Sequence, residues 1–180
     1  MKTLCIDIDG TVADSMTSWL RIANEEYGIG KSKNDINDYN LEKITGIKEE
    51  TVYEIYRRVW DNYAEIPPVD EYVPAVVEKL HETFIIKIVT GTVGDERAVK
   101  AWLKLNNIPY DEFIHVRKSI EKLNAEGDAF IEDDPAIARA LAEKGRYVIM
   151  IEQGWNKSQV PDGVKVARSW LEVEKLLLRR

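Results

Sequence analysis

The chain has 180 residues, of which 44% are hydrophobic and 32% charged, a composition typical of one compact domain with room for a small insertion. Its net charge is −7 and its basic residues are scattered along the chain, which argues against a nucleic-acid polymer as partner. No apolar run reaches membrane-spanning length, no basic leader precedes the first aspartates, and Cys5 is the single cysteine, so we expect a cytoplasmic protein with no membrane association and no disulfide.

Short apolar runs alternate with helical patterns along most of the chain, and this alternation predicts a parallel sheet built from strand-helix-strand units. Five runs have the length of strands, at residues 3–8, 84–89, 113–116, 129–131 and 147–151. Helical spacing of apolar residues follows at residues 96–105, 119–125, 136–144 and 170–178. We therefore predict an α/β fold with a doubly wound, five-stranded parallel sheet of the Rossmann-like type.

Residues 14–70 break this alternation, because they are helical in pattern and contain no convincing strand. The first helix is expected to begin with Asp14 or Ser15 as its N-cap and to end at Gly28. A turn-rich stretch follows at residues 31–40, and apolar spacing predicts a second helix over residues 52–63, which a pair of prolines ends. We predict a small helical cap at 14–70, inserted into a core domain made of residues 1–13 and 71–180.

Two aspartates, Asp7 and Asp9, stand where the first predicted strand ends, in the segment Asp-Ile-Asp-Gly-Thr. Side chains alternate along a strand, so both carboxylates should project on the same side. At about 4 Å they would repel by about 4 kcal/mol at an effective dielectric near 20, unless a cation lies between them. Mg²⁺ prefers oxygen ligands, and Gly10 gives the backbone freedom to turn. The alternative is a strand that ends in a polar turn with solvated aspartates.

Three further segments are expected at the same edge of the sheet, because ligands of open parallel sheets bind beyond the carboxyl ends of the strands. A second acidic pair, Asp133 and Asp134, follows the fourth predicted strand. The second strand leads into Thr90-Gly91-Thr92, which offers hydroxyl and backbone N–H groups to a phosphate. Lys118 follows the third strand and can supply a positive charge.

This order of motifs resembles the four motifs of the haloacid dehalogenase superfamily, and the resemblance spans Asp7 to Asp134. Within the superfamily, the chain is most similar to the 5′(3′)-deoxyribonucleotidase group. The similarity rests on Asp14 soon after the first motif, on Ile-Glu-Asp-Asp-Pro as the fourth motif, and on Gln-Gly-Trp-Asn at residues 153–156. Gly91 departs from the residue often found in nucleotidases. The resemblance implies a sheet order of 3-2-1-4-5 and a helical cap over the active site.

The resemblance also implies catalytic roles that agree with the chemistry of the residues. Asp7 is expected to attack phosphorus and form an aspartyl phosphate, while Asp9 acts first as general acid and then as general base. The Mg²⁺ ligands would be the Asp7 carboxylate, the Asp9 backbone carbonyl and Asp133, with Asp134 orienting a bound water. The phosphate is expected to contact these groups: Asp9, Gly10, Thr90, Gly91, Thr92 and a lysine.

The identity of the phosphate lysine is open between two positions. Lys118 directly follows the strand and is preferred, while Lys122 lies one α-helical turn later on the same face. The residues expected to contact the rest of the substrate are Trp19, Trp155 and Asn156. Aromatic residues of the insertion have two possible roles, stacking on a nucleobase or forming the cap's own core, and the second is favoured for any single one.

The function that fits these features is Mg²⁺-dependent hydrolysis of a small phosphate monoester, with a nucleoside monophosphate as the expected substrate. The alternatives within the same chemistry are a sugar phosphate and a phosphoglycolate-like compound. A metal-dependent nuclease is less favoured, because the chain is acidic and a phosphate-binding threonine and lysine are expected. A binding protein without activity would be expected to have a broken motif set. The oligomeric state, monomer or homodimer, is left open.

Overall fold

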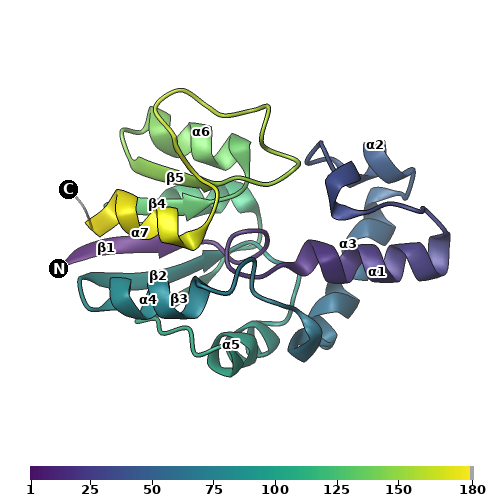
Figure 1. Cartoon of the computed structure of the whole chain (residues 1–180), viewed down its shortest axis with the longest axis horizontal. Coiled ribbons are helices and arrows are strands. Elements are labelled where there is room, and N and C mark those ends of the chain that lie inside the picture. Colours follow the sequence, from purple (N-terminus) through teal and green to yellow (C-terminus); the bar gives the residue numbers. More distant parts are fainter. Residues whose placement is uncertain (179–180) are drawn as a thin grey trace.

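The computed structural model describes residues 1–178 and contains one sheet of six parallel strands in the order β3-β2-β1-β4-β5-β6 (Figure 1). The strands are β1 Lys2–Ile6, β2 Phe84–Thr90, β3 Glu112–His115, β4 Ala129–Glu132, β5 Tyr147–Ile151 and β6 Lys165–Ala167. The expected parallel α/β fold is confirmed, and strands 1 to 5 have the expected order. The sixth strand was missed because it is three residues long and only Ala167 in it is buried, too short for a periodic signal.

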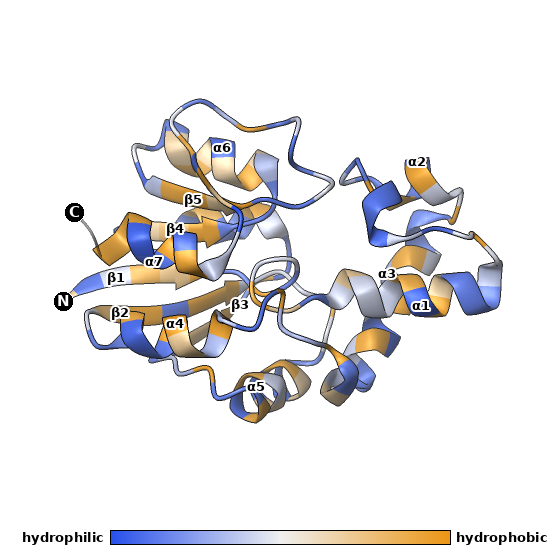
Figure 2. Ribbon diagram, in the orientation of Figure 1, coloured by the Kyte–Doolittle hydropathy of each residue, from blue (hydrophilic) through white to orange (hydrophobic). Residues whose placement is uncertain are grey.

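The strands bury both faces, since alternate residues enter two separate apolar clusters. Leu4 and Ile6 belong to the larger cluster, whereas Cys5 between them belongs to the smaller one. The larger cluster includes residues of α4 Val73–His81, α5 Glu96–Leu105 and α7 Trp170–Leu178, while α6 Pro135–Glu143 packs into the smaller one. Figure 2 shows the resulting pattern of hydrophobic strands flanked by helices with polar outer faces.

Two helices differ from the expectation. Helix α4 was not predicted, although Pro74 occupies its first turn, where a missing N–H costs nothing. Residues 119–124, expected to be α-helical, form the 3₁₀ helix η3 Ser119–Asn124. The change matters for the site, because a 3₁₀ helix places residues three apart on one face, not four apart.

The 14–70 segment is helical, as expected. Helix α1 Ser15–Tyr27 begins at Asp14, whose side chain accepts a hydrogen bond from Thr17 N at 3.2 Å, and it ends at Gly28 in the left-handed conformation with φ 60°. The other helices are η1 Lys33–Asp35, α2 Leu41–Thr45, α3 Glu49–Asp61 and η2 Tyr63–Glu65. Figure 1 shows α1, α2 and α3 lying together beyond the carboxyl ends of the strands. The two short helices η1 and α2 were not predicted.

Two stretches of backbone connect this segment to the sheet, and they pair with each other. Asp14 N donates to Pro67 O at 2.8 Å, and Val69 N donates to Val12 O at 2.9 Å. The chain therefore leaves and re-enters the core at one place. The division into core and cap stays a prediction, as do the cellular location and the oligomeric state. Within residues 1–178, no helix is both long and apolar enough to cross a membrane.

Burial protects Cys5 chemically. Its side chain is 1% exposed, and burial raises the pKa of the thiol to about 12. Only the thiolate reacts with disulfide reagents, so we expect native protein at pH 8 to react with Ellman's reagent at least about 100-fold more slowly than protein unfolded in guanidinium. Comparing the two rates measures this, and equal rates would mean that Cys5 is accessible in the native state.

Candidate active site

The carboxylate of Asp7 lies at the base of a cavity of about 500 Å³ that core residues line on one side and residues of the 14–70 segment on the other. Asp7 directly follows β1, and its backbone N–H donates to Ile131 O of β4 at 3.0 Å. The parallel ladder thus continues through Asp7 and fixes its position. Its Oδ1 lies 2.7 Å from Lys122 Nζ, and the residue is 5% exposed.

Three buried carboxylates meet at this point. One ligand oxygen from each of Asp7, Glu132 and Asp133 lies within 4.8 Å of the others. Burial, followed by the charge of Asp7, raises the pKa of Asp133 well above its ordinary value, and burial raises that of Glu132 to about 8. Burial is the largest cause of both shifts, and the Lys122 ammonium offsets the charge of the three carboxylates only in part. The excess negative charge and the oxygen donors fit a hard divalent cation.

The turn after Asp7 is packed tightly against the second acidic segment. Gly10 has φ 72°, a conformation that side chains disfavour, and a Cβ at this position would lie 2.3 Å from Asp133 Oδ2. Only glycine therefore allows the first motif to approach Asp133 so closely. This contact brings together the ends of β1 and β4, as the sequence predicted.

The acidic pair lies one residue earlier than expected. Asp134 was predicted to join Asp133, but its Oδ1 accepts from Ala136 N at 2.8 Å and from Ile137 N at 3.4 Å, as the N-cap of α6. Asp134 is therefore an N-cap and is not among the three carboxylates that lie within 4.8 Å of one another. Glu132 takes the second position instead. Its sequence signal is an ionisable residue at the end of an otherwise apolar, fully buried strand, Ala-Phe-Ile-Glu.

The lysine at the site is Lys122 and not the preferred Lys118. Lys122 Nζ contacts Asp7 at 2.7 Å and Glu132 at 3.0 Å, whereas Lys118 is exposed and does not line the cavity. The reason is the 3₁₀ geometry of η3, which places Ser119 and Lys122 on the cavity side. Burial alone would lower the pKa of Lys122, but Asp7 and Glu132 raise it above the ordinary value, so the ammonium keeps its proton.

Asp9 lines the cavity beside Asp7 and interacts with three side chains. Trp60 Nε1 of α3 donates to Asp9 Oδ1 at 3.1 Å, and Ser15 and Thr92, which line the same cavity, stabilise the charged form of the carboxylate. Burial raises the pKa of Asp9, and these three side chains lower it in part. A raised pKa favours the protonated form of the carboxyl, which is the form that a general acid uses.

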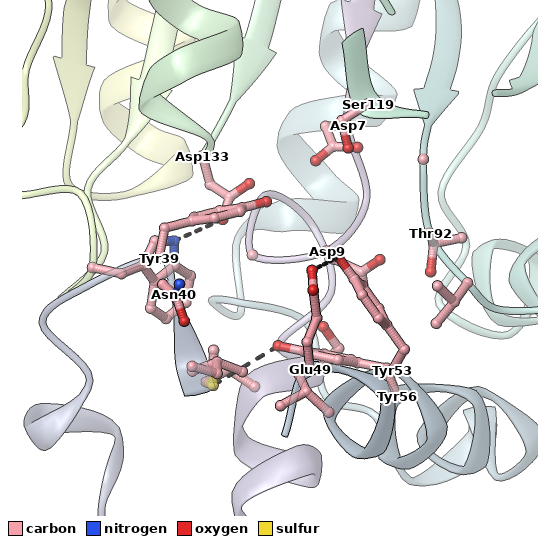
Figure 3. Close-up of a pocket in the computed structure, with 18 of the residues that line it drawn as sticks. Asp7, Asp9, Tyr39, Asn40, Glu49, Tyr53, Tyr56, Thr92, Ser119 and Asp133 are labelled. Carbon is pink, nitrogen blue, oxygen red and sulfur yellow. Dashed lines mark hydrogen bonds between the residues drawn. The ribbon is translucent and has the colours of Figure 1, made fainter. Parts of the chain in front are cut away.

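The loop after β2 approaches the cavity as expected, but through different atoms. Gly91 and Thr92 line the cavity. Thr90 is fully buried and does not, because its Oγ1 accepts from Thr92 N at 3.1 Å and so holds the loop. Ser119 lies opposite Gly91, because a Cβ added at Gly91 would be 3.1 Å from the Oγ of Ser119. The sequence did not predict Ser119 as a site residue. Ser119 and Asp7, both labelled in Figure 3, line the same cavity.

The expected substrate contacts separate into one cavity residue and two structural ones. Trp155 lines the cavity, and its Nε1 donates to Asp133 Oδ2 at 2.9 Å. Asn156 is fully buried, and its Nδ2 donates to the backbone oxygens of Asp133 and Ile151, both at 2.8 Å. Trp19 is fully buried in the 14–70 segment, where its Nε1 donates to Val52 O. Asn156 and Trp19 are therefore not exposed to a substrate.

Tyrosines of the 14–70 segment form the opposite wall of the cavity. Figure 3 shows Tyr53 and Tyr56 of α3 facing the cavity across from Asp7 and Asp133, and Tyr39 also lines it. Tyr53 OH donates to Glu49 Oε1 at 3.3 Å. Tyr56 lines the cavity whereas Trp19 is fully buried, so the insertion supplies both its own core and part of this wall.

Comparisons with known proteins agree with this geometry. The family model described as 5′ nucleotidase, deoxy (pyrimidine), cytosolic type C protein (NT5C) matches residues 1–180. The chain belongs to this family. It is 27% identical, over 176 residues, to a nucleotidase of Clostridium acetobutylicum, covering 94% of this chain and 90% of the relative. This NT5C family member is thus a phosphatase of the haloacid dehalogenase type.

Solved structures show the same fold at low sequence identity. A haloacid dehalogenase-like hydrolase of Streptococcus pneumoniae has a TM-score of 0.68 at 17% identity, with 96% of each chain covered. The YfnB protein of Bacillus subtilis, solved bound to magnesium, has a TM-score of 0.63 at 14% identity, with 98% of each chain covered. These likenesses support the fold of the NT5C member and not its substrate.

The two lysines provide a matched test of the site. We expect Lys122→Met to lower kcat for phosphate release by at least about 100-fold, because it removes the one ammonium beside Asp7. Lys118→Met removes the same charge from an exposed position and should retain kcat within about twofold. Phosphate-release assays on the two variants decide the matter, and the assignment of Lys122 is wrong if Lys118→Met is the more damaging change.

Proposed function

We propose that this protein hydrolyses nucleoside monophosphates with Mg²⁺, through an aspartyl phosphate on Asp7. The observation that carries the proposal is the Asp7 carboxylate, buried at the base of a cavity with Lys122 at 2.7 Å and Asp133 beside it. A buried nucleophile next to one ammonium and two further acidic groups suits a transferring phosphoryl group, whose charge lies on its equatorial oxygens.

The metal is proposed from the donor set. The carboxylates of Asp7 and Asp133 are the proposed ligands, since each has an oxygen within 4.8 Å of the other, whereas both oxygens of Glu132 hydrogen-bond Lys122 Nζ, at 3.0 and 3.3 Å. By the family resemblance, the backbone carbonyl of Asp9 completes the protein ligands. When bound, Mg²⁺ would neutralise phosphate oxygens and lower the repulsion between the phosphate and the acidic site. The YfnB protein, which has the same fold and was solved with magnesium bound, supports the same choice of ion.

The proposed reaction uses two aspartates in sequence. An oxygen of Asp7 forms a bond to phosphorus as the bond from phosphorus to the leaving oxygen breaks, and Asp9 gives its proton to that oxygen. Asp9, now ionised, takes a proton from a water that attacks the aspartyl phosphate, which regenerates Asp7 and releases inorganic phosphate. Lys122, with the Gly91, Thr92 and Ser119 groups that line the cavity, is proposed to hold the phosphoryl oxygens.

The nucleoside part of the proposal rests on the opposite wall. We propose that the 14–70 segment is the cap and that Tyr39, Tyr53 and Tyr56, with Trp155 from the core, surround the leaving group. A cavity of about 500 Å³ lies in the range of small-molecule sites, and aromatic walls suit a flat base. The name of the family, which refers to deoxy and pyrimidine nucleotides, supports the same substrate class.

A panel of phosphate monoesters tests the function. Inorganic phosphate release is measured with deoxynucleoside monophosphates, ribonucleoside monophosphates, sugar phosphates and phosphoglycolate, each with Mg²⁺ and with EDTA. We expect Mg²⁺-dependent release that is fastest with a deoxynucleoside monophosphate. Faster turnover of a sugar phosphate or phosphoglycolate would contradict the substrate, and undiminished release in EDTA would contradict the metal.

Asp7→Asn tests the nucleophile. The amide is isosteric with the carboxylate but does not attack phosphorus, so kcat should fall by at least about 1,000-fold while the circular dichroism spectrum stays unchanged. Brief incubation of the wild type with a ³²P-labelled monoester, followed by an acid quench, should trap label on the protein, and the variant should trap none. An Asp7→Asn enzyme with a tenth of wild-type kcat would refute the role of Asp7.

A further inference from the structure

Trp60 is held in one position by three elements of the fold. It lies on α3 of the 14–70 segment and is fully buried, with Trp102 of α5 packed edge-on against it at a centroid distance of 6.2 Å and an interplanar angle of 83°. Gly94 leaves the space for its ring, since a Cβ there would lie 2.4 Å from Trp60 Cγ. The indole N–H then points at Asp9 Oδ1, 3.1 Å away.

We propose that Trp60 is a positioning residue that fixes which oxygen of Asp9 carries the catalytic proton; this inference rests on the proposed function. An indole N–H only donates, so Asp9 Oδ1 accepts a hydrogen bond whether the carboxyl is ionised or not. The proton of the acid form is therefore carried by Oδ2. Ser15 and Thr92, which line the cavity with Asp9, have hydroxyls that both donate and accept, so they are compatible with either protonation state.

This arrangement matters because Asp9 must give and take a proton at one place. If the Asp9 carboxyl could turn freely, its proton would reside on either oxygen. In a fraction of the enzyme molecules the proton would then point away from the leaving group. Orientation of this kind contributes to the rate because the transfer needs a short, aligned contact. Trp60 comes from the 14–70 segment, so this segment completes the acid as well as lining the cavity.

The proposal predicts an effect that depends on the leaving group. An alkoxide, such as the 5′ oxygen of a nucleoside, is a poor leaving group and needs a proton from Asp9 as it departs. A thiolate leaves without one. A nucleotide with sulfur in place of the bridging 5′ oxygen keeps the same base, sugar and charge, so the two compounds differ in their need for the acid. The kcat/KM value covers the steps up to departure of the leaving group.

The experiment compares Trp60→Phe with the wild type on this pair, using the preferred nucleoside monophosphate of the panel. Phenylalanine keeps most of the packing and removes the N–H donor. We expect kcat/KM to fall by about tenfold or more for the oxygen ester and by less than about threefold for the sulfur ester. Gly94→Ala gives a second route to the same result, because the added methyl displaces the indole without altering the N–H donor or Asp9.

Trp19→Phe is the matched control. Trp19 is also fully buried in the 14–70 segment, and its indole N–H donates to the backbone oxygen of Val52. The Trp19→Phe variant loses this one bond. Trp19→Phe should change kcat/KM by the same factor for the oxygen ester and the sulfur ester. Equal losses on both esters in Trp60→Phe, or no loss, would overturn the positioning role, while a wild type that releases phosphate from neither ester would refute the proposed function itself. If Trp60→Phe fails to fold, Gly94→Ala decides between these outcomes.

Discussion

The Lys122 ammonium lies between the carboxylates of Asp7 and Glu132, and the arrangement of the acidic site depends on this buried contact. Removing one partner of such a buried pair costs about 3–5 kcal/mol, because the charge left behind has no solvent. Lys122 belongs to η3, and Glu132 ends β4, so the contact ties a 3₁₀ turn to the sheet. It also leaves Asp133 without a compensating cation of its own, which is the electrostatic condition for binding a metal.

Much of the fold was predictable because its signals are local. Buried parallel strands have near-continuous apolar sequences, and β1, β2, β4 and β5 were found in this way; α1 was found from its capping residues Asp14 and Gly28. Strand β6 and helix α2 are too short for periodicity to identify them. Their structure depends on packing against neighbours that are distant in sequence, and a short stretch of sequence holds no information on such contacts.

The candidate site was predictable to the level of segments but not of every side chain. The strand ends at Asp7 and Asp133 meet as parallel topology requires, and Gly10 allows the contact. Two side chains are placed differently from the expectation, each within a stretch of a few residues whose local geometry the sequence does not reveal. Lys118 was preferred because it directly follows the predicted strand, and Asp134 was chosen as the second residue of an acidic pair, but Lys122 of η3 contacts Asp7 and the Asp134 carboxylate caps α6.

Two indole N–H groups bind carboxylates of the candidate site, and they come from different parts of the chain. Trp155 of the core donates to Asp133, whereas Trp60 of the 14–70 segment donates to Asp9. An indole offers a donor without a charge and without an acceptor, so each bond orients a carboxylate and leaves its charge for the cation or the proton. A lysine in place of either tryptophan would bring a positive charge that competes with the cation and with the proton for the carboxylate. Tryptophan at both positions therefore orients the two carboxylates without adding a second cation beside Lys122.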